Sequence, residues 1–163
     1  PDLAIAQNFF SPQAETGRMD GGLSLVLSGK GDGNFRALSP AESGVVIFGD
    51  AAGLSMADHD ADGSPGLHFA INSAAVRSFT VAPGKLLSVE LPVLPGTRVS
   101  LKGKGAPDQL AELHVGSGYL SQSAPVLFFA RPREPALLEV RWPDGVKKAY
   151  SVRPGTPRVV LKR

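Results

Sequence analysis

The stretch Gly53-Leu54-Ser55-Met56-Ala57-Asp58-His59-Asp60-Ala61-Asp62-Gly63-Ser64-Pro65-Gly66-Leu67 is the most informative part of the sequence. Asp58, Asp60 and Asp62 stand at alternate positions, so they can converge on one hard cation if the backbone then turns sharply, and Gly63 permits that turn. The spacing is typical of a calcium loop with Asp58, Asp60, Asp62 and Ser64 as oxygen ligands. Aspartate and glycine are also favoured in turns for backbone reasons alone, so a turn without metal is the alternative.

The residues after the loop predict a strand rather than a helix. An EF-hand would need a helix on each side and a bidentate glutamate at the twelfth loop position, where this chain has Phe69. Leu67, Phe69 and Ile71 alternate with more polar or smaller residues, which is the pattern of a half-buried strand. The loop is therefore expected to lie between two strands.

Two further stretches support a repeat architecture. Gly31-Asp32-Gly33-Asn34-Phe35 predicts a hairpin turn, and Gly49-Asp50-Ala51 precedes the strand that leads into the aspartate loop. Together with that loop, these stretches resemble the FG-GAP (VCBS) repeat of β-propellers, whose blades carry the loop Asp-x-Asp-x-Asp-Gly-x-x-Asp-Leu between strands. The resemblance implies calcium as a structural cofactor. Its ninth loop position, normally aspartate, is Gly66 here, so one carboxylate ligand is missing.

The first residues also resemble this repeat. Pro1-Asp2-Leu3 is similar to the tail of a preceding loop of the same kind, followed by a strand. Only one full blade is present, whereas closed propellers have typically about four to eight. The sequence therefore predicts a fragment of a larger propeller protein. Strands around residues 3–6 and 67–71 are expected to be sheet edges, which favours self-association or pairing with the remainder of the parent chain.

The second half predicts a compact β-domain. Apolar and polar residues alternate in several short segments: Leu87-Val89-Leu91 with Ser88 and Glu90, Val99-Leu101, Leu113-Val115, Leu138-Val140-Trp142, Tyr150-Val152 and Val159-Leu161. Asp144-Gly145 is a strong hairpin signal. The 19 glycines and 14 prolines divide the chain of 163 residues into short elements. We predict an all-β fold, with a propeller-blade-like repeat over residues 1–75 and a small β-sandwich or barrel over residues 76–163.

Three motifs in this half follow one another in the order and spacing of a known domain family. They are Gly96-Thr97-Arg98-Val99, then Gly116-Ser117-Gly118-Tyr119-Leu120-Ser121-Gln122-Ser123, then Glu139-Val140-Arg141-Trp142-Pro143-Asp144-Gly145. They resemble the ASPIC/UnbV domain, which follows FG-GAP repeats in exported bacterial proteins and in animal extracellular matrix proteins such as the cartilage acidic protein. That family usually has Phe-Gly-Leu-Gly after its Ser-Gln motif. Here the sequence is Phe128-Phe129-Ala130-Arg131, so the corresponding turn is expected to be built differently.

A candidate ligand-binding segment lies inside the second motif. Tyr119, Ser121 and Gln122 offer a stacking surface, a hydroxyl and an amide to a sugar or a peptide. The alternative is structural, because serine and glutamine also satisfy backbone groups where a sheet bends. Trp142 before Pro143 is interpreted as a core residue, with a binding-site aromatic as the alternative.

Charge divides the chain near Ala75. Residues 1–75 hold only three basic residues, Arg18, Lys30 and Arg36, and are acidic overall, whereas residues 76–163 are basic. The basic half is consistent with a solvated surface or with a polyanionic partner such as an acidic glycan or a lipid headgroup. Nucleic acid is not expected, because aromatic residues are few and no recognition motif accompanies the charge. No run of about 18 apolar residues exists, so no membrane span is predicted.

The sequence contains no recognised catalytic motif. It has no Gly-x-Ser-x-Gly elbow, no His-Glu-x-x-His and no P-loop, and we assign no catalytic residue. Glycosidase carboxylate pairs are assembled from distant sequence positions, and the candidates in the second half are Glu90, Asp108, Glu112, Glu134, Glu139 and Asp144. We expect a non-enzymatic, extracellular or periplasmic, calcium-associated module for binding or cell adhesion, with a glycan or matrix protein as partner. The alternative is an accessory or catalytic part of a larger biosynthetic or carbohydrate-active enzyme.

Overall fold

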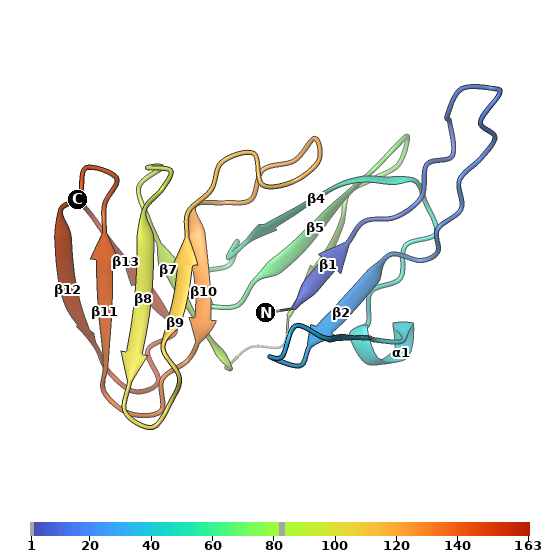
Figure 1. The fold of residues 1–163 in the computed structure, drawn as a ribbon. Helices are drawn as coiled ribbons and strands as arrows, with labels where there is room; N and C mark the ends of the chain where they lie inside the picture. The colour runs from blue at the N-terminus through green and yellow to red at the C-terminus, as the bar shows by residue number, and fades with distance from the viewer. Residues whose placement is uncertain (1, 82–83) are drawn as a thin grey trace. The chain divides into compact units, whose positions relative to one another are not determined.

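The computed structural model of the protein describes residues 2–81 and 84–163; Pro1, the first residue of the predicted loop tail, lies outside them. The described residues form strands β1 (Leu3–Ile5), β2 (Leu25–Gly29), β3 (Phe35–Ala37), β4 (Ala51–Ala57), β5 (Gly66–Ile71), β6 (Arg77–Thr80), β7 (Leu86–Glu90), β8 (Arg98–Gly103), β9 (Gln109–Glu112), β10 (Val126–Ala130), β11 (Ala136–Arg141), β12 (Lys147–Val152) and β13 (Arg158–Val160), and one helix, α1 (Pro40–Ser43) (Figure 1). The predicted all-β class is confirmed.

The chain divides into two compact units whose segments alternate along the sequence. The first unit comprises Pro1–Ser55, Leu67–Phe79 and Gly118–Gln122. The second comprises Met56–Gly66, Thr80–Ser117 and Ser123–Arg163. The aspartate loop therefore belongs to the second unit, whereas most of the strands on either side of it belong to the first.

The first unit contains two three-stranded sheets. Their strand orders are β1-β2-β3 and β4-β5-β6. The strands β2 and β3 pair through Gly29 and Phe35, so the predicted hairpin turn over residues 31–35 is confirmed. Val45, Ile47, Ala51 and Phe69 form the buried core of this unit. The position of β5 corrects one expectation: residues 67–71 are not a sheet edge, because β5 lies between β4 and β6.

The helix α1 is stabilised by its ends rather than by its length. The Ser39 side chain accepts a hydrogen bond from the Glu42 backbone, and the Glu42 carboxylate accepts one from the Ser39 backbone, which forms a capping box. Gly44 ends the helix with φ +70°. The hydrogen bond from the Ser39 backbone, together with Arg36, lowers the pKa of Glu42 to about 2. No helix in the described part of the chain meets the length and apolarity that crossing a bilayer requires.

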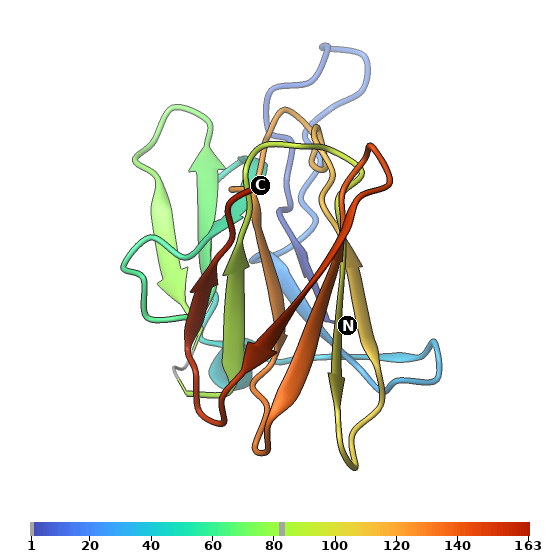
Figure 2. The same ribbon diagram turned by 90° about the vertical axis from the view of Figure 1, so that its left-hand side faces the viewer.

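The second unit is a β-sandwich. One sheet has the order β10-β7-β13 and the other β12-β11-β8-β9. Both contribute to a single buried cluster: Leu87, Val89, Leu91, Val99, Leu101, Leu113, Phe129, Ala136, Leu138, Val140, Trp142, Val152 and Leu161. Strand β13 pairs in parallel with β7, beside which it lies in Figure 2. Trp142 is 1% exposed, so its interpretation as a core residue is confirmed.

Most of the strands predicted in this unit are present, and two details differ. The hairpin at Asp144-Gly145 joins β11 to β12, with Arg141 opposite Lys147. The strand expected over residues 113–115 is wrong, because β9 ends at Glu112 and Val115 is 57% exposed. Residues 128–130, expected to build a turn, belong to strand β10 instead and pair with β7.

Candidate metal centre

The predicted metal ligands converge in the loop between β4 and β5. Asp58, Asp60 and Asp62 each offer a carboxylate oxygen, and these oxygens lie within 4.8 Å of one another. Asp60 is exposed, while Asp58 and Asp62 are half-buried. No lysine or arginine among the described residues forms an ion pair with the three. The spacing in the sequence therefore predicted a convergence that the structure contains.

The aspartate side chains stabilise the loop by accepting hydrogen bonds from its backbone N–H groups. The Asp62 Oδ1 atom accepts a hydrogen bond of 2.7 Å from the Ser64 N–H, and Asp60 Oδ1 accepts a longer one from the Asp62 N–H. Gly63 has φ +87°, a conformation that L side chains rarely adopt. A Cβ atom at this position would lie 2.2 Å from the carbonyl oxygen of Pro157, so Gly63 serves both the turn and a close backbone contact.

The two oxygens of Asp58 have different surroundings. Oδ2 accepts hydrogen bonds from the Ser88 hydroxyl at 2.7 Å and from the Gly63 N–H at 3.2 Å. Oδ1 is buried and has no hydrogen-bond partner among the described residues. A buried carboxylate oxygen without a partner is costly, because its lost hydration is not replaced. One oxygen of Asp58 is thus anchored and the other is left free to bind a cation.

Ser64 supplies a second unpartnered oxygen near the end of the loop. Its side chain is 1% exposed, and Oγ has no hydrogen-bond partner in the described protein. The donor set is made entirely of oxygen atoms, which calcium prefers, and backbone carbonyls and water can complete six to eight ligands. These residues fit a calcium ion. The position of Gly66 at the start of β5 leaves the site without a carboxylate at the ninth loop position.

Ser88 is the site residue that the sequence analysis missed. The alternation in β7 placed it on the polar side of its strand, but it is fully buried. It lies thirty residues after Asp58 and reaches it only through the fold of the second unit. A serine between Leu87 and Val89 looks the same in a sequence whether it faces solvent or a buried carboxylate, so no signal in one sequence separates the two cases.

The predicted ligand-binding segment forms a tight turn. Gly118 and Ser121 make an isolated β-bridge, with Tyr119 and Leu120 at its tip. Tyr119 is 79% exposed and Gln122 is exposed, whereas the Oγ of Ser121 is buried and has no hydrogen-bond partner within residues 2–81 and 84–163. Tyr119, Ser121 and Gln122 therefore do not present one common surface, and their assignment to ligand binding stays a prediction.

Contacts with β4 show what this turn does structurally. A Cβ atom at Gly53 would lie 3.6 Å from both the Leu120 carbonyl oxygen and the Ser121 Cβ. A Cβ atom at Gly118 would lie 2.1 Å from the Ser121 Oγ and 3.3 Å from the Leu54 carbonyl oxygen, so a larger residue there would displace the Ser121 side chain. The turn packs closely against β4, which supports the structural alternative for its glycine and serine residues.

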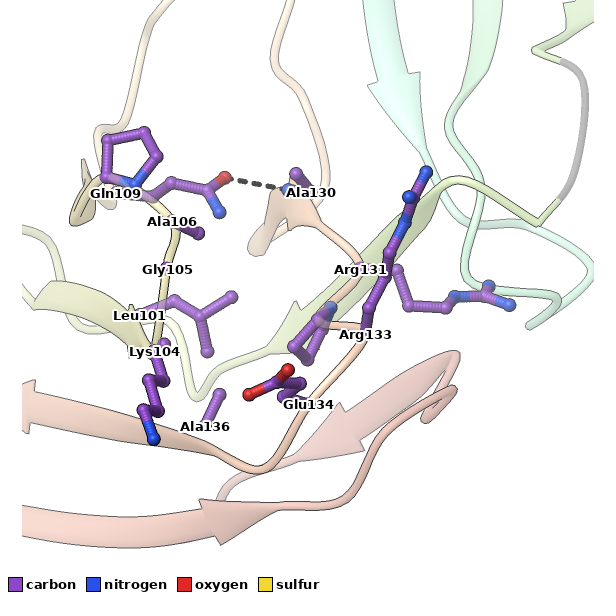
Figure 3. A pocket seen from close by; sticks show the side chains of 13 residues that line it. Leu101, Lys104, Gly105, Ala106, Gln109, Ala130, Arg131, Arg133, Glu134 and Ala136 are labelled. Atoms are coloured by element: carbon purple, nitrogen blue, oxygen red, sulfur yellow. Dashed lines mark hydrogen bonds between the residues drawn. The ribbon is translucent and has the colours of Figure 1, made fainter.

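A cavity of about 390 Å³ lies between the turn after β8 and the segment that joins β10 to β11. Gln109 accepts a hydrogen bond of 2.7 Å from the Ala130 N–H at its rim. Figure 3 shows the side chains of Arg131 and Arg133 extending away from Leu101, and Arg131 donates to the Leu86 carbonyl oxygen. The charged groups do not converge on a common point, so this cavity does not have the polar arrangement of a binding site.

Four of the six carboxylates considered for glycosidase chemistry form ion pairs. Glu90 pairs with Arg158, Glu112 with Arg98, Glu139 with Lys102 and Asp144 with Arg163. Each pair lies on the surface of the second unit. The arrangement gives each of these four carboxylates its own cation rather than joining two of them across a substrate cleft.

Comparison with known proteins gives a family match in the second half of the chain. Residues 94–163 match the family model described as ASPIC and UnbV. The predicted resemblance to that family is thereby confirmed over these residues, which cover β8 to β13. No curated protein matches the chain. The resemblance of the first part to the FG-GAP repeat stays a prediction.

Proposed function

We propose that this chain is a non-enzymatic, exported binding module whose aspartate loop takes up calcium. The observation that carries the proposal is the state of Asp58: Oδ2 is held by Ser88 and Gly63, while the buried Oδ1 has no partner. A divalent cation at this point would satisfy Oδ1 and relieve the repulsion among three neighbouring carboxylates. The ion pairs of the other candidate carboxylates support the non-enzymatic role.

The wider context belongs to the same proposal. Residues 1–75 act as an FG-GAP-like propeller blade and residues 76–163 as an ASPIC/UnbV-like domain, within a larger propeller protein that mediates adhesion. The weak ligand set fits an extracellular or periplasmic location, because calcium sites of extracellular modules bind with dissociation constants of about 10⁻⁴ to 10⁻³ M. A loop with one carboxylate fewer than usual needs such high calcium.

Calcium is expected to raise the melting temperature of the protein. A site filled at about a hundred times its dissociation constant gains about 2.7 kcal/mol. For a chain of this size the gain corresponds to a rise of roughly 5–10 °C. We expect this rise between chelator and about 10 mM calcium in differential scanning calorimetry. Equal midpoints in the two conditions would show that the loop is only a turn.

Two matched variants separate the metal from general charge effects. Asp62 and Asp32 each accept a hydrogen bond from the N–H two residues further on, but only Asp62 lies in the cluster. We expect Asp62→Asn to abolish the calcium-dependent rise in melting temperature and Asp32→Asn to retain it.

Ser88→Ala should weaken calcium binding about 10- to 100-fold in titration calorimetry, because residues that orient metal ligands typically have effects of this size.

The free edge of β1 supports a proposal about assembly. Among the described residues this strand ends its sheet, and Leu3 and Ile5 are 45% and 39% exposed. We propose that the edge pairs with a second copy of the chain or with the remainder of the parent protein, since unpaired strand edges attract further strands. Sedimentation velocity should show a dimer for the wild type and a monomer for Leu3→Lys. A wild-type monomer at about 100 μM would contradict self-association, because interfaces weaker than this are of the transient kind.

A further inference from the structure

The outer face of the sheet β12-β11-β8-β9 carries a row of cations. Lys147 lies opposite Arg141, and Arg141 lies opposite Arg98, so three neighbouring strands each contribute one basic residue at the same level. All three side chains are exposed. Their strands lie side by side in Figure 1. We call Lys147, Arg141 and Arg98 the cation row.

The cation row is only partly neutralised. Arg98 donates a hydrogen bond of 2.6 Å to Glu112, which lies opposite it on β9. This hydrogen bond lowers the pKa of Glu112, so the carboxylate stays ionised. Arg141 and Lys147 form no ion pair with any described residue. The cation row therefore carries an excess of positive charge. Like charges at directly opposed positions of a sheet are destabilising, and a bound anion would reduce this repulsion.

The neighbouring level of the sheet does not block access to the cation row. It contains Ala149, Glu139, Ser100 and Leu110 in register. Glu139 forms an ion pair with Lys102 at 2.7 Å. Lys102 lies opposite Leu137, one level further from the cation row, so the Glu139 carboxylate is directed away from the row. Ala149 is small, and the Ser100 hydroxyl can donate and accept hydrogen bonds. The surface beside the row is therefore low at Ala149 and Ser100, and Leu110, which is 72% exposed, is its one large apolar side chain at this level.

We propose that the cation row binds a linear acidic polysaccharide that lies across the strands. Neighbouring strands are about 4.8 Å apart, so the three cations extend over about 10 Å and can contact successive carboxylate or sulfate groups. A nucleic acid fits less well, because single strands are held by stacking of bases on aromatic side chains, and the outward positions of these four strands carry none. This assignment gives the proposed binding module a ligand class and does not depend on the calcium loop.

The test uses the full chain and heparin as the probe, with neutral dextran and double-stranded DNA of similar length for comparison. In titration calorimetry at about 0.1 M salt, where screening acts beyond about 10 Å, we expect saturable binding of heparin and none of dextran. The double variant Arg141→Ser with Lys147→Ser should bind at least about tenfold more weakly, corresponding to about 1.4 kcal/mol. Tighter binding of DNA than of heparin would overturn the polysaccharide assignment.

The control removes the same charge from elsewhere in the second unit. Lys104 and Lys162 are exposed and lie outside the row, so Lys104→Ser with Lys162→Ser should change heparin affinity less than about twofold. Equal losses in the two double variants would show diffuse charge attraction and overturn the row as a site. Glu112→Gln removes the only carboxylate among the described residues that forms an ion pair with the row. It should tighten binding several-fold, a gain that misfolding cannot produce.

Calcium separates this inference from the proposed function. Heparin affinity should be equal in chelator and in about 10 mM calcium, because the cation row contains no part of the aspartate loop. A requirement for calcium would overturn the assignment to the row. Conversely, failure of calcium to raise the melting temperature would contradict the metal centre and leave heparin binding by the row unaffected.

Discussion

Gly63→Ala is expected to destabilise the second unit by about 2–5 kcal/mol. An alanine with φ near +87° costs about 1–2 kcal/mol, because its Cβ approaches the following carbonyl oxygen. In addition, the Cβ atom would lie 2.2 Å from the Pro157 oxygen, so the loop or the residues before β13 must move. Forcing extra atoms into packed structure costs about 1–3 kcal/mol. Denaturant unfolding followed by circular dichroism measures the sum.

Gly145→Ala is the matched control for this change. Gly145 has the same φ of +87° and also belongs to the second unit, but a Cβ atom there would meet nothing within 4 Å. The control should lose only the backbone contribution of about 1–2 kcal/mol. The difference between the two variants then measures the close contact with Pro157. Equal losses would mean that this contact contributes nothing to stability.

The same substitution should also reduce calcium binding. Gly63 donates its N–H to Asp58 Oδ2 and allows the turn that brings Asp62 back towards Asp58. Displacing the backbone at this point moves both carboxylates, whereas Gly145 is not part of the loop. We expect Gly63→Ala to lose the calcium-dependent rise in melting temperature and Gly145→Ala to keep it.

The convergence of the aspartates could be predicted from sequence because it is local. Alternate spacing followed by glycine fixes where three carboxylates can meet within a few residues of chain. The Ser88 hydroxyl and the Pro157 carbonyl could not be predicted, because both reach the loop through tertiary packing of the second unit. Hydrogen-bond partners from distant strands leave no pattern near the loop in a single sequence.

Strands with one buried face show the alternation most clearly in the sequence. In β8 and β11, residues such as Val99 and Val140 are buried while Arg98 and Arg141 face solvent, so the alternation is visible. Strand β10 was missed because its Val-Leu-Phe-Phe run is continuously apolar, and such a run does not show a period of two. Residues 113–115 alternate, and Leu113 still forms backbone hydrogen bonds with Thr97 and Gly96, but β9 ends at Glu112.

Two replacements of Trp142 should separate the stability gained by packing of the indole from the cost of burying its N–H group. The side chain is 1% exposed and packs in the core of the second unit, so Trp142→Ala should cost about 3–5 kcal/mol. Its Nε1 is buried and has no hydrogen-bond partner among the described residues, a state that by itself costs about 1–3 kcal/mol. Trp142→Phe removes this unsatisfied donor while retaining an aromatic ring, so we expect a loss of stability below about 2 kcal/mol.

Because Trp142 is the only tryptophan in the chain, unfolding of these variants should be followed by circular dichroism rather than by fluorescence. A phenylalanine variant as unstable as the alanine variant would show that the indole N–H is satisfied, for example by a bound water molecule, and that its hydrogen bond contributes to the fold.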